Sequence, residues 1–480
     1  MKRTLAVCFA AILLLSSCAS SQSSDIEKET AAQTETETVT TEDTGLKPDI
    51  PELDYNGAEF RIYHNDYGNN NYDVIADGIT GEPLNDIVYQ RNIDTEEKFN
   101  IHFNTYVEPG DIYGKSVMNS ITAGDDAYEL VITTGLSLMN LISMNLTYDL
   151  TSSMPYMDLS KPWWSKDFQE NTNINGKLFA AAGDITHIGL ESIQFIAFNR
   201  DLFYANDLET PYNDVRNGTW TYDKFNSLTK DYTRDLNGDG KLTLADDQYG
   251  YIIHENIMTA GYMFTNGAHI CTYRDGLPCL DLEVDKLSDV CDAYKETVKN
   301  NVMMDDSKYG KEGINVFLTD RALFTDANMR AVRHYFRDMK SDFGLVPLPK
   351  FDESIPRYTV FAGCEANIYA VPVTTEKTEM ISAVLEYMAY YGYTNIIPIY
   401  YDVILGDKLM RDQDSRDMMG ILRDSMYYDF GNWSGLPSLL SVGLYLIRDK
   451  KDVASYLAAN QSKMEKELAS LMESVSAAEG

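Results

Sequence analysis

The stretch AEFRIYH (residues 58–64) indicates the fold, because it is the first of three short apolar runs that alternate with helical patterns. IHFNTYV (101–107) is the second run, and YELVITT (128–134) is the third. Residues 84–100 repeat apolar side chains at helical spacing, and a second helical pattern surrounds Val117. This strand–helix–strand–helix–strand order predicts a parallel sheet covered by helices.

A second group of elements is predicted beyond residue 160. Apolar runs predict strands within 193–203, 248–254, 321–328 and 343–350. Helical patterns follow within 221–232, 287–300, 381–392 and 414–428, and the C-terminal tail carries one apolar stripe. The body, from about Pro51 to the end, is too long for one compact core, so we expect an α/β protein with two domains.

The N-terminus predicts export. Lys2 and Arg3 precede an apolar run from Leu5 to Leu15, and small residues lead to Cys18. This arrangement resembles the bacterial lipobox, so residues 1–18 are predicted to be a lipoprotein signal peptide whose Cys18 carries the lipid. An ordinary signal peptide with a chance cysteine is the alternative.

Residues 19–50 are rich in Ser, Thr, Gln and Glu and contain no aromatic residue. Such a segment buries too little apolar surface to offset its ordering entropy, so we expect a disordered acidic tether. The tether would hold the body close to the membrane surface, on the extracellular face or in the periplasm.

The composition limits the partners and the redox chemistry. The net charge is −34, with 74 acidic and 40 basic residues, which excludes nucleic acid and anionic lipid headgroups as good partners. Few cysteines occur in the body, so a disulfide framework is not expected. Cys271 and Cys279 are either paired or free. The body's cysteines are Cys271, Cys279, Cys291 and Cys364.

The stretch DLNGDGKLTLAD (235–246) has the spacing of a calcium-binding loop. Gly240 occupies the sixth position, where the loop turns sharply. Because no partner loop exists, we expect a structural ion rather than a sensor. A metal-free acidic turn is the alternative, and Asp247 is a second candidate for the closing position. The predicted ligands are Asp235, Asn237, Asp239, Asp246 and the carbonyl oxygen of Lys241.

Catalytic motifs are not evident. The six histidines lack metal-binding spacing, and no Gly-x-Ser-x-Gly turn occurs. Pairs of carboxylates for glycoside cleavage cannot be ranked among 74 acidic residues. Trp433, in a predicted Gly-rich loop after a helix, is a candidate stacking platform for a sugar face.

Several long stretches together resemble the extracellular solute-binding lipoproteins of ABC-type sugar importers, relatives of the maltodextrin-binding protein. The resemblance implies a two-lobe, venus-flytrap fold of type II in which the chain crosses between lobes. It implies residues 51–150 and 318–370 for lobe one, and 151–317 and 371–475 for lobe two. The stretches are the lipobox, PWWSKDFQENTNINGKLFAAAGDITHIGLESIQFIAFNRDLF (162–203), NGTWTYDKF (217–225), DLNGDGKLTLADDQYGY (235–251) and FGLVPLPKFDE (343–353).

The resemblance also implies a function. A monomeric, membrane-anchored protein without catalytic activity would deliver a mono- or oligosaccharide to the transmembrane subunits of an ABC permease. A surface glycoside hydrolase and a glycan-adhesion lipoprotein are the alternatives.

The family's binding positions fall on loops that follow the strands of each lobe. By this resemblance the Asp184 carboxylate takes two sugar hydroxyls, and Trp433 stacks on the sugar. Asn328 stands where the maltodextrin pattern has a tryptophan, which argues against a long linear glucan. The predicted ligand-binding residues are Thr134, Asp184, Glu255, Asn256, Asn328 and Trp433.

Overall fold

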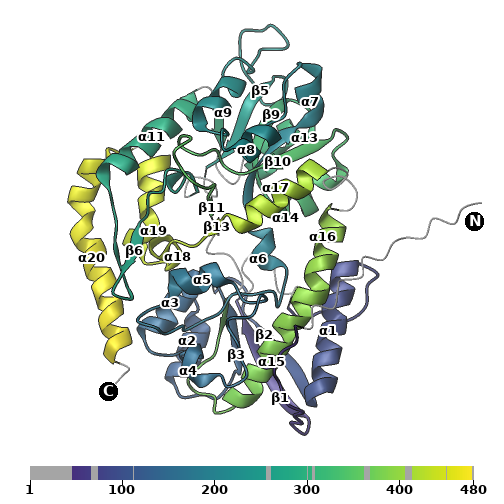
Figure 1. Ribbon diagram of the computed structural model, residues 1–480, viewed down its shortest axis with the longest axis vertical. Helices are drawn as coiled ribbons and strands as arrows, with labels where there is room; N and C mark the ends of the chain where they lie inside the picture. Colours follow the sequence, from purple (N-terminus) through teal and green to yellow (C-terminus); the bar gives the residue numbers. More distant parts are fainter. Residues whose placement is uncertain are drawn as a thin grey trace, which may run out of the picture. The chain divides into compact units, whose positions relative to one another are not determined.

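Two sheets, each covered by helices, organise the chain in Figure 1. The computed structural model describes residues 46–65, 74–111, 113–255, 261–299, 301–304, 309–361, 368–405, 413–449 and 451–477. The predicted signal peptide, Cys18 and most of the predicted tether lie outside these residues. No helix in the described ranges is both long enough and apolar enough to cross a membrane.

The first sheet has four strands in the order β12-β3-β1-β2. Strands β1 (Ala58–His64), β2 (Ile101–Val107) and β3 (Leu130–Thr133) are mutually parallel, as the sequence predicts. Strand β12 (Ile368–Ala370) adds an antiparallel edge beside β3, although it comes from a distant part of the chain.

Helices α1 (Pro83–Phe99) and α15 (Thr378–Tyr391) pack together beside this sheet (Figure 1). The start of α1 is well specified, because proline opens the helix and the Glu82 carboxylate accepts the N–H of Asn85. Asn100 ends α1 in the left-handed region, at φ 49°. Apolar residues from the sheet, α1 and α15 form one continuous core.

The second sheet has five strands in the order β10-β4-β9-β5-β8. Strand β5 runs parallel to β8 and β9, whereas β4 runs antiparallel to β9 and β10. All six residues of β4 and all six of β5 are buried, which is typical of strands covered on both faces. The strands are β4 (Gln194–Asn199), β5 (Tyr249–His254), β8 (Val302–Met304), β9 (Ala322–Asn328) and β10 (Phe343–Val346).

Aromatic side chains fill the core between this sheet and its helices. Phe225 packs edge-on against Phe324, with ring centroids 5.0 Å apart. The Trp220 indole is fully buried and donates to the Pro347 carbonyl at 2.9 Å. The principal helices are α7 (Arg200–Ala205), α8 (Tyr212–Asn217), α9 (Tyr222–Thr229), α11 (Val284–Lys299), α13 (Ile314–Leu318), α14 (Met329–His334) and α17 (Gln413–Asp424).

The strand pairing differs from the predicted division of the chain. Strands β9 and β10 were expected with lobe one, within 318–370, but their hydrogen bonds place them in the second sheet. Helix α15 was expected with lobe two, but it packs in the core of the first sheet. Strand order along the chain does not reveal which sheet a strand joins. The chain therefore crosses between the sheets after β3, after β10 and after α15.

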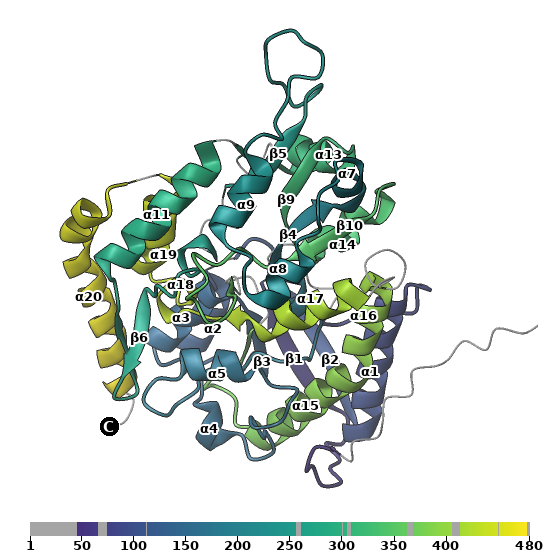
Figure 2. The ribbon, with the colours of Figure 1, turned by 45° about the horizontal axis from the view of Figure 1, so that its top comes forward.

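Two small strand pairs and the C-terminal helices complete the fold. Strand β6 (Cys271–Arg274) pairs with β7 (Leu277–Leu280), and β11 (Val360–Phe361) pairs with β13 (Met426–Tyr427). Helix α20 (Val453–Ala477) contacts α3 beside the first sheet and α11 beside the second (Figures 1 and 2). It therefore touches both halves of the molecule.

Cys271 and Cys279 are both free thiols. Cys279 lies opposite Thr272 in the β6–β7 pair, and Cys271 lies opposite Leu280. Because neighbouring residues of a strand point to opposite faces, the two thiols face apart. A disulfide would need a shift in strand register.

The remaining helices are short or irregular. They are α2 (Lys115–Thr122), α3 (Gly135–Ser143), α4 (Leu150–Ser153), α5 (Lys166–Thr172), α6 (Ile188–Glu191), η2 (Tyr309–Gly313), η3 (Phe336–Asp338), η4 (Gly392–Ile396), α16 (Ile397–Leu405), α18 (Phe430–Trp433), α19 (Pro437–Gly443) and η5 (Leu444–Arg448).

Candidate functional site

A pocket of about 670 Å³ lies where the chain passes between the two sheets. Four segments line it: residues 159–170, the crossover at 182–190, Tyr369 of β12, and residues 423–428 at the end of α17 and in β13. Because these segments belong to both halves of the molecule, the pocket spans them. Its volume falls within the range of small-molecule sites.

Asp184 lies on the crossover and lines the pocket. Its backbone N–H donates to the Trp163 carbonyl at 2.9 Å, which fixes the peptide against the first half of the molecule. Burial raises the pKa of the Asp184 carboxyl to about 7, and the positive charge of Arg423 opposes that rise. The Asp184 residue as a whole is half-buried, and it contributes to the lining of the pocket.

Two glycines allow the crossover to pack closely. A Cβ atom on Gly183 would lie 2.5 Å from the Trp163 carbonyl oxygen and 2.7 Å from Cε3 of Trp164. A Cβ atom on Gly392, in η4, would collide with the Asp184 carbonyl oxygen. Both positions therefore require glycine, because a side chain would clash with the neighbouring atoms.

Glu386 of α15 fixes the two tryptophans beside the crossover. The Trp163 and Trp164 indoles donate to its carboxylate oxygens at 3.1 and 2.8 Å. Burial raises the pKa of Glu386 to about 7, while the bonds from the two indoles oppose the rise. Both indoles are almost fully buried, so they form the wall behind the pocket rather than an open platform.

The charges that line the pocket are nearly balanced. Asp167 of α5 accepts the N–H of Tyr428 at 3.1 Å, and burial raises the pKa of its carboxyl to about 6. A mixed lining of this kind suits a polar, uncharged solute better than an ion of either sign. The cationic residues are Lys161, Lys166 and Arg423, and the anionic residues are Asp167, Glu170, Asp184 and Asp424.

Comparison with known proteins identifies the fold. No protein-family model and no curated protein sequence matches the chain. An ABC substrate-binding protein from Listeria monocytogenes, solved in complex with cycloalternan, matches with a TM-score of 0.55 at 13% identity, over 86% of this chain and 99% of its own. The GacH receptor of Streptomyces glaucescens, solved without ligand and with acarbose, matches with a TM-score of 0.56 at 11% identity, over 85% and 99%.

An ABC transporter solute-binding protein from Agrobacterium radiobacter, solved in complex with ribitol, matches with a TM-score of 0.51 at 14% identity. The match covers 86% of this chain and 99% of that one. The chain has the two-lobe fold of ABC solute-binding proteins. The four-stranded sheet is thus the core of lobe one and the five-stranded sheet that of lobe two, and the pocket lies between the lobes.

Of the five predicted ligand-binding residues that the structure describes, Asp184 alone is among the residues that line this pocket. Thr134 adjoins Gly135, which lies close to Trp433: a Cβ atom on Gly135 would be 3.3 Å from Nε1 of that tryptophan. Trp433 lies in the short helix α18, not in a loop, and is 1% exposed. Its ring packs edge-on against Phe168 of α5, 5.0 Å between centroids. Trp433 does not line the pocket, and its stacking role remains a prediction.

The other three predicted residues lie in lobe two. The backbone N–H of Glu255 donates to the Met304 carbonyl at 2.8 Å, and Asn256 lies outside the described residues. The Asn328 side chain caps α14 by accepting the N–H of Ala331 at 2.9 Å. Neither Glu255 nor Asn328 lines the pocket, and their ligand roles remain predictions.

Sequence reasoning missed several residues of the pocket, notably Arg423, Tyr369 and the Trp163–Trp164 pair. The adjacent tryptophans were a visible signal, since two large aromatic residues rarely follow each other without a packing reason. Arg423 gave no such signal, because the helical pattern shows only that it lies on the polar face of its helix.

A polar cluster connects the crossover to lobe two. The His187 ring stacks on Tyr400, with centroids 5.0 Å apart. Arg333 of α14 lies 3.2 Å from the Glu191 carboxylate and 3.0 Å from Nε2 of His187. These contacts join α6, α14 and α16 next to the pocket.

The predicted calcium loop closes on its own backbone. Asp235 accepts the N–H groups of Gly238 and Gly240 at 2.7 and 2.8 Å, and Gly240 has the expected positive φ of 76°. Asp247, fully buried, accepts the N–H of Leu236 at 2.9 Å. Within the described ranges, no group of three or more His, Cys, Asp or Glu is gathered to hold a metal. The turn fits the expected loop, but its carboxylates do not converge on one point.

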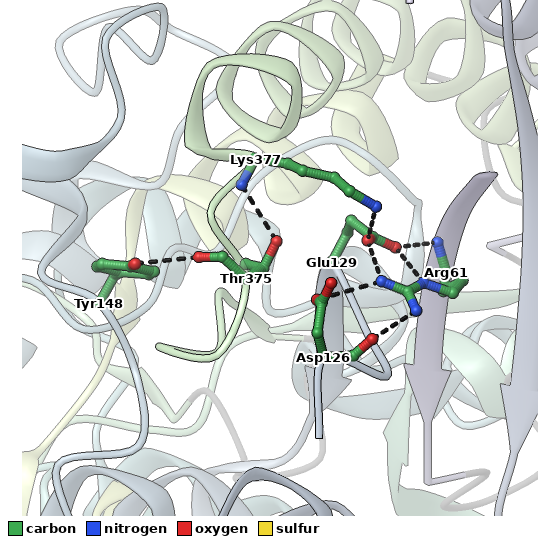
Figure 3. A network of polar contacts seen from close by, with 6 residues as sticks. All are labelled: Arg61, Asp126, Glu129, Tyr148, Thr375 and Lys377. Carbon is green, nitrogen blue, oxygen red and sulfur yellow. Dashed lines mark hydrogen bonds and ion pairs between the residues drawn. The ribbon is translucent and has the colours of Figure 1, made fainter. Parts of the chain in front are cut away.

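A buried carboxylate also braces lobe one (Figure 3). Glu129 accepts Nε of Arg61 at 2.9 Å and Nζ of Lys377 at 2.7 Å. Burial by itself would raise the pKa of Glu129, but these bonds hold it below its ordinary value. Because Lys377 precedes α15, the network ties that helix to β1.

Proposed function

We propose that the chain is a solute-binding protein that captures a neutral mono- or oligosaccharide between its lobes and delivers it unaltered to an ABC importer. The pocket between the lobes carries this proposal, since it combines a partly buried carboxylate, an arginine and aromatic walls. Such a mixture is typical of sites that bind polyhydroxylated solutes. The matched proteins bind cycloalternan, acarbose and ribitol, which supports the same ligand class here.

The test is a thermal-shift screen with ribitol, mannobiose, maltotriose and acarbose. A saccharide at 100 times its dissociation constant should stabilise the folded chain by about 2.7 kcal/mol. The sugar recovered after incubation should be chemically unchanged. Absence of any shift at millimolar concentrations would contradict the proposal.

A glycoside hydrolase is the second candidate, because Asp167 and Asp184 both line the pocket and both have raised pKa values. Hydrolysis predicts reducing ends that increase with time and with protein concentration. The binding proposal predicts none. The matched structures are binding proteins, which favours binding.

We propose that Cys18 carries a lipid that anchors the protein to the cell membrane, with residues 19–50 as the tether. The residues themselves support this proposal through the charged start, the apolar run and the small residues before Cys18. Cys18→Ala should release the protein from the detergent phase in a phase-separation assay. Retention of the variant in that phase would contradict the anchor.

We propose that the loop at 235–246 binds a structural Ca²⁺ ion. The ligand spacing and the positive φ of Gly240 support this proposal, since the sixth position of such loops is where the chain turns sharply. Asp239→Ala should abolish the calcium dependence of the melting temperature and leave saccharide affinity unchanged. A chelator that does not alter the melting temperature of the wild-type protein would contradict the site.

A further inference from the structure

Helix α5 lines the pocket and belongs to lobe one. Four of its seven residues are among those that line the pocket. Beyond the helix the chain returns to the first sheet, where Ala181 and Tyr369 of β12 exchange two backbone hydrogen bonds of 2.9 Å. Leu178 donates its N–H to the Asp149 carboxylate at 3.2 Å. Residues 166–181 are therefore attached to lobe one.

Two tight turns of the same kind lie on either side of the boundary between the lobes. In lobe one, Asn175 and Gly176 have φ values of 53° and 83°. At the tip of the β6–β7 hairpin, Asp275 and Gly276 have φ values of 51° and 78°. Positive φ at both central residues is the signature of the type I′ turn, whose twist matches that of a hairpin. Both turns are exposed to solvent.

The hairpin is attached to lobe two. It lies between β5 and α11 in the chain, and the Asn266 side chain before it donates to the Lys286 carbonyl of α11 at 2.7 Å. The Asp429 carboxylate, which caps α18, accepts the N–H of Ile270 at 3.0 Å. The hairpin lies beside α20, which packs on both β7 and α11 (Figures 1 and 2). Helix α11 in turn packs on α9 beside the second sheet.

Two hydrogen bonds join this hairpin to α5 and to the turn that follows α5. The Tyr273 hydroxyl donates to the Asn171 carbonyl, in the last turn of α5, at 2.6 Å. The Asn175 N–H donates to the Gly276 carbonyl at 2.8 Å, where the two turns meet. A Cβ atom on Gly276 would lie 3.6 Å from Cα of Asn175, so the two backbones are in direct contact. Both bonds cross from one lobe to the other.

We propose that the β6–β7 hairpin is a latch between the lobes: the bonds at Tyr273 and Gly276 hold α5 beside the pocket, and they break when the lobes separate. The latch rests on the two-lobe fold, and its effect on saccharide binding rests on the proposed function. Tyr273 does not line the pocket, so it is a positioning residue that acts through α5. Because both turns are preformed, closing the latch orders little additional chain.

The latch predicts that a saccharide enters only after the two bonds have broken, so the fraction of separated lobes limits the association rate. Tyr273→Phe removes one bond. The ratio of separated to joined lobes should rise about 2- to 10-fold, and association should accelerate by the same factor. Stopped-flow tryptophan fluorescence with mannobiose and maltotriose measures this rate. Tyr335→Phe, at a 48% exposed position, is the matched control and should associate at the wild-type rate.

A covalent latch should have the opposite effect. The close approach of the two turns places cysteines at positions 175 and 276 within reach of a disulfide. Asn175→Cys combined with Gly276→Cys should associate with either saccharide more slowly after oxidation. Reductant should restore the rate in the same sample, which excludes a folding defect as the cause. Gly276→Cys alone should not respond to reductant.

Association rates that respond neither to Tyr273→Phe nor to the disulfide would overturn the latch, as would failure of the paired cysteines to cross-link. Hydrogen exchange in the ligand-free protein distinguishes this result from failure of the proposed function. Exchange in residues 171–178 should accelerate in Tyr273→Phe and slow on oxidation of the cysteine pair, whether or not a saccharide binds. If wild type binds neither saccharide, the proposed function fails, and the exchange data alone decide the latch.

Discussion

The Trp433 side chain is enclosed by Gly135 on one side and by Phe168 on another. An aromatic ring in this position stabilises the junction between α3, α5 and α18 through packing. Sequence reasoning assigned the ring to a sugar because a tryptophan in a Gly-rich stretch has no evident partner. The partners come from segments 265 to 298 residues earlier in the chain, which no local pattern reveals.

Replacement of Trp433 by a small residue should therefore act mainly on the stability of the fold rather than on sugar binding. Trp433→Ala is expected to lower the free energy of unfolding by about 3–5 kcal/mol, because it leaves a cavity in a closed site. Denaturation in urea measures this loss. Leu236→Ala, at a 54% exposed position, is the control and should change stability by less than about 0.5 kcal/mol. Normal stability of Trp433→Ala, combined with weakened sugar binding, would show instead that the ring is a ligand platform.

Glu386 gives a second prediction at this scale. Glu386→Gln places an amide N–H₂ where the carboxylate now accepts two indole N–H groups, so one indole loses its acceptor. Stability should fall by about 1–3 kcal/mol, and the near-ultraviolet circular dichroism of the tryptophans should change. Glu379→Gln, at an exposed position on the same helix, should do neither. An unaltered tryptophan spectrum in Glu386→Gln would contradict the assigned role.

At the scale of elements, the crossover and η4 depend on close contact at a glycine. Gly392→Ala should destabilise the protein, because the added methyl group collides with the Asp184 carbonyl. We expect a loss of about 1–3 kcal/mol in thermal or urea unfolding. Gly420→Ala is the matched control, since Gly420 lies in α17 with no atom within 4 Å of an added Cβ. That variant should be neutral or up to about 1 kcal/mol more stable. Equal effects of the two substitutions would contradict the packing described.

The sequence predicted most of the strands, but it did not predict which sheet each strand joins. The runs at 58–64 and 101–107 are strands with the predicted bounds, because alternating apolar residues and flanking helices leave few alternatives. The positions of β9 and β10 were predicted as strands but were assigned to the wrong sheet. Their partners are set by long-range hydrogen bonds, which periodicity does not encode.

The pocket was predictable only at Asp184, where the resemblance to a family placed a binding residue. Arg423 approaches it from 239 residues further along the chain, and only the folded arrangement brings the two segments together. Asn328 illustrates the converse case, since a residue at a suggestive position serves as a helix cap. Residue type and local sequence thus identified candidate binding residues, but only the folded structure shows which of them line the pocket.

For the whole molecule, buried carboxyls predict how stability depends on pH. Burial raises the pKa of Asp326 to about 8, and it raises the pKa of Asp184 and of Glu386 to about 7. The folded chain therefore holds protons that the unfolded chain releases between about pH 4 and pH 8. Stability falls as pH rises through this range. The net charge of −34 adds self-repulsion in the same direction.

The melting temperature should consequently be higher at pH 5 than at pH 8 in calorimetry at constant ionic strength. Asp326→Asn should flatten this slope, because it removes the carboxyl with the highest pKa among those named here. Below about pH 4 the trend should reverse, since Glu129, whose pKa is lowered by Arg61 and Lys377 against the effect of burial, then loses its charge. A melting temperature that rises steadily from pH 5 to pH 8 would contradict these assignments.

Hydrogen exchange with mass spectrometry, with and without a saturating saccharide from the thermal-shift screen, tests the central claim most directly. A sugar held between the lobes should slow exchange in residues 159–170, 182–190 and 423–428 and leave the calcium-loop residues 235–246 unchanged. Protection confined to other parts of the chain, with these three segments unaffected, would contradict the account.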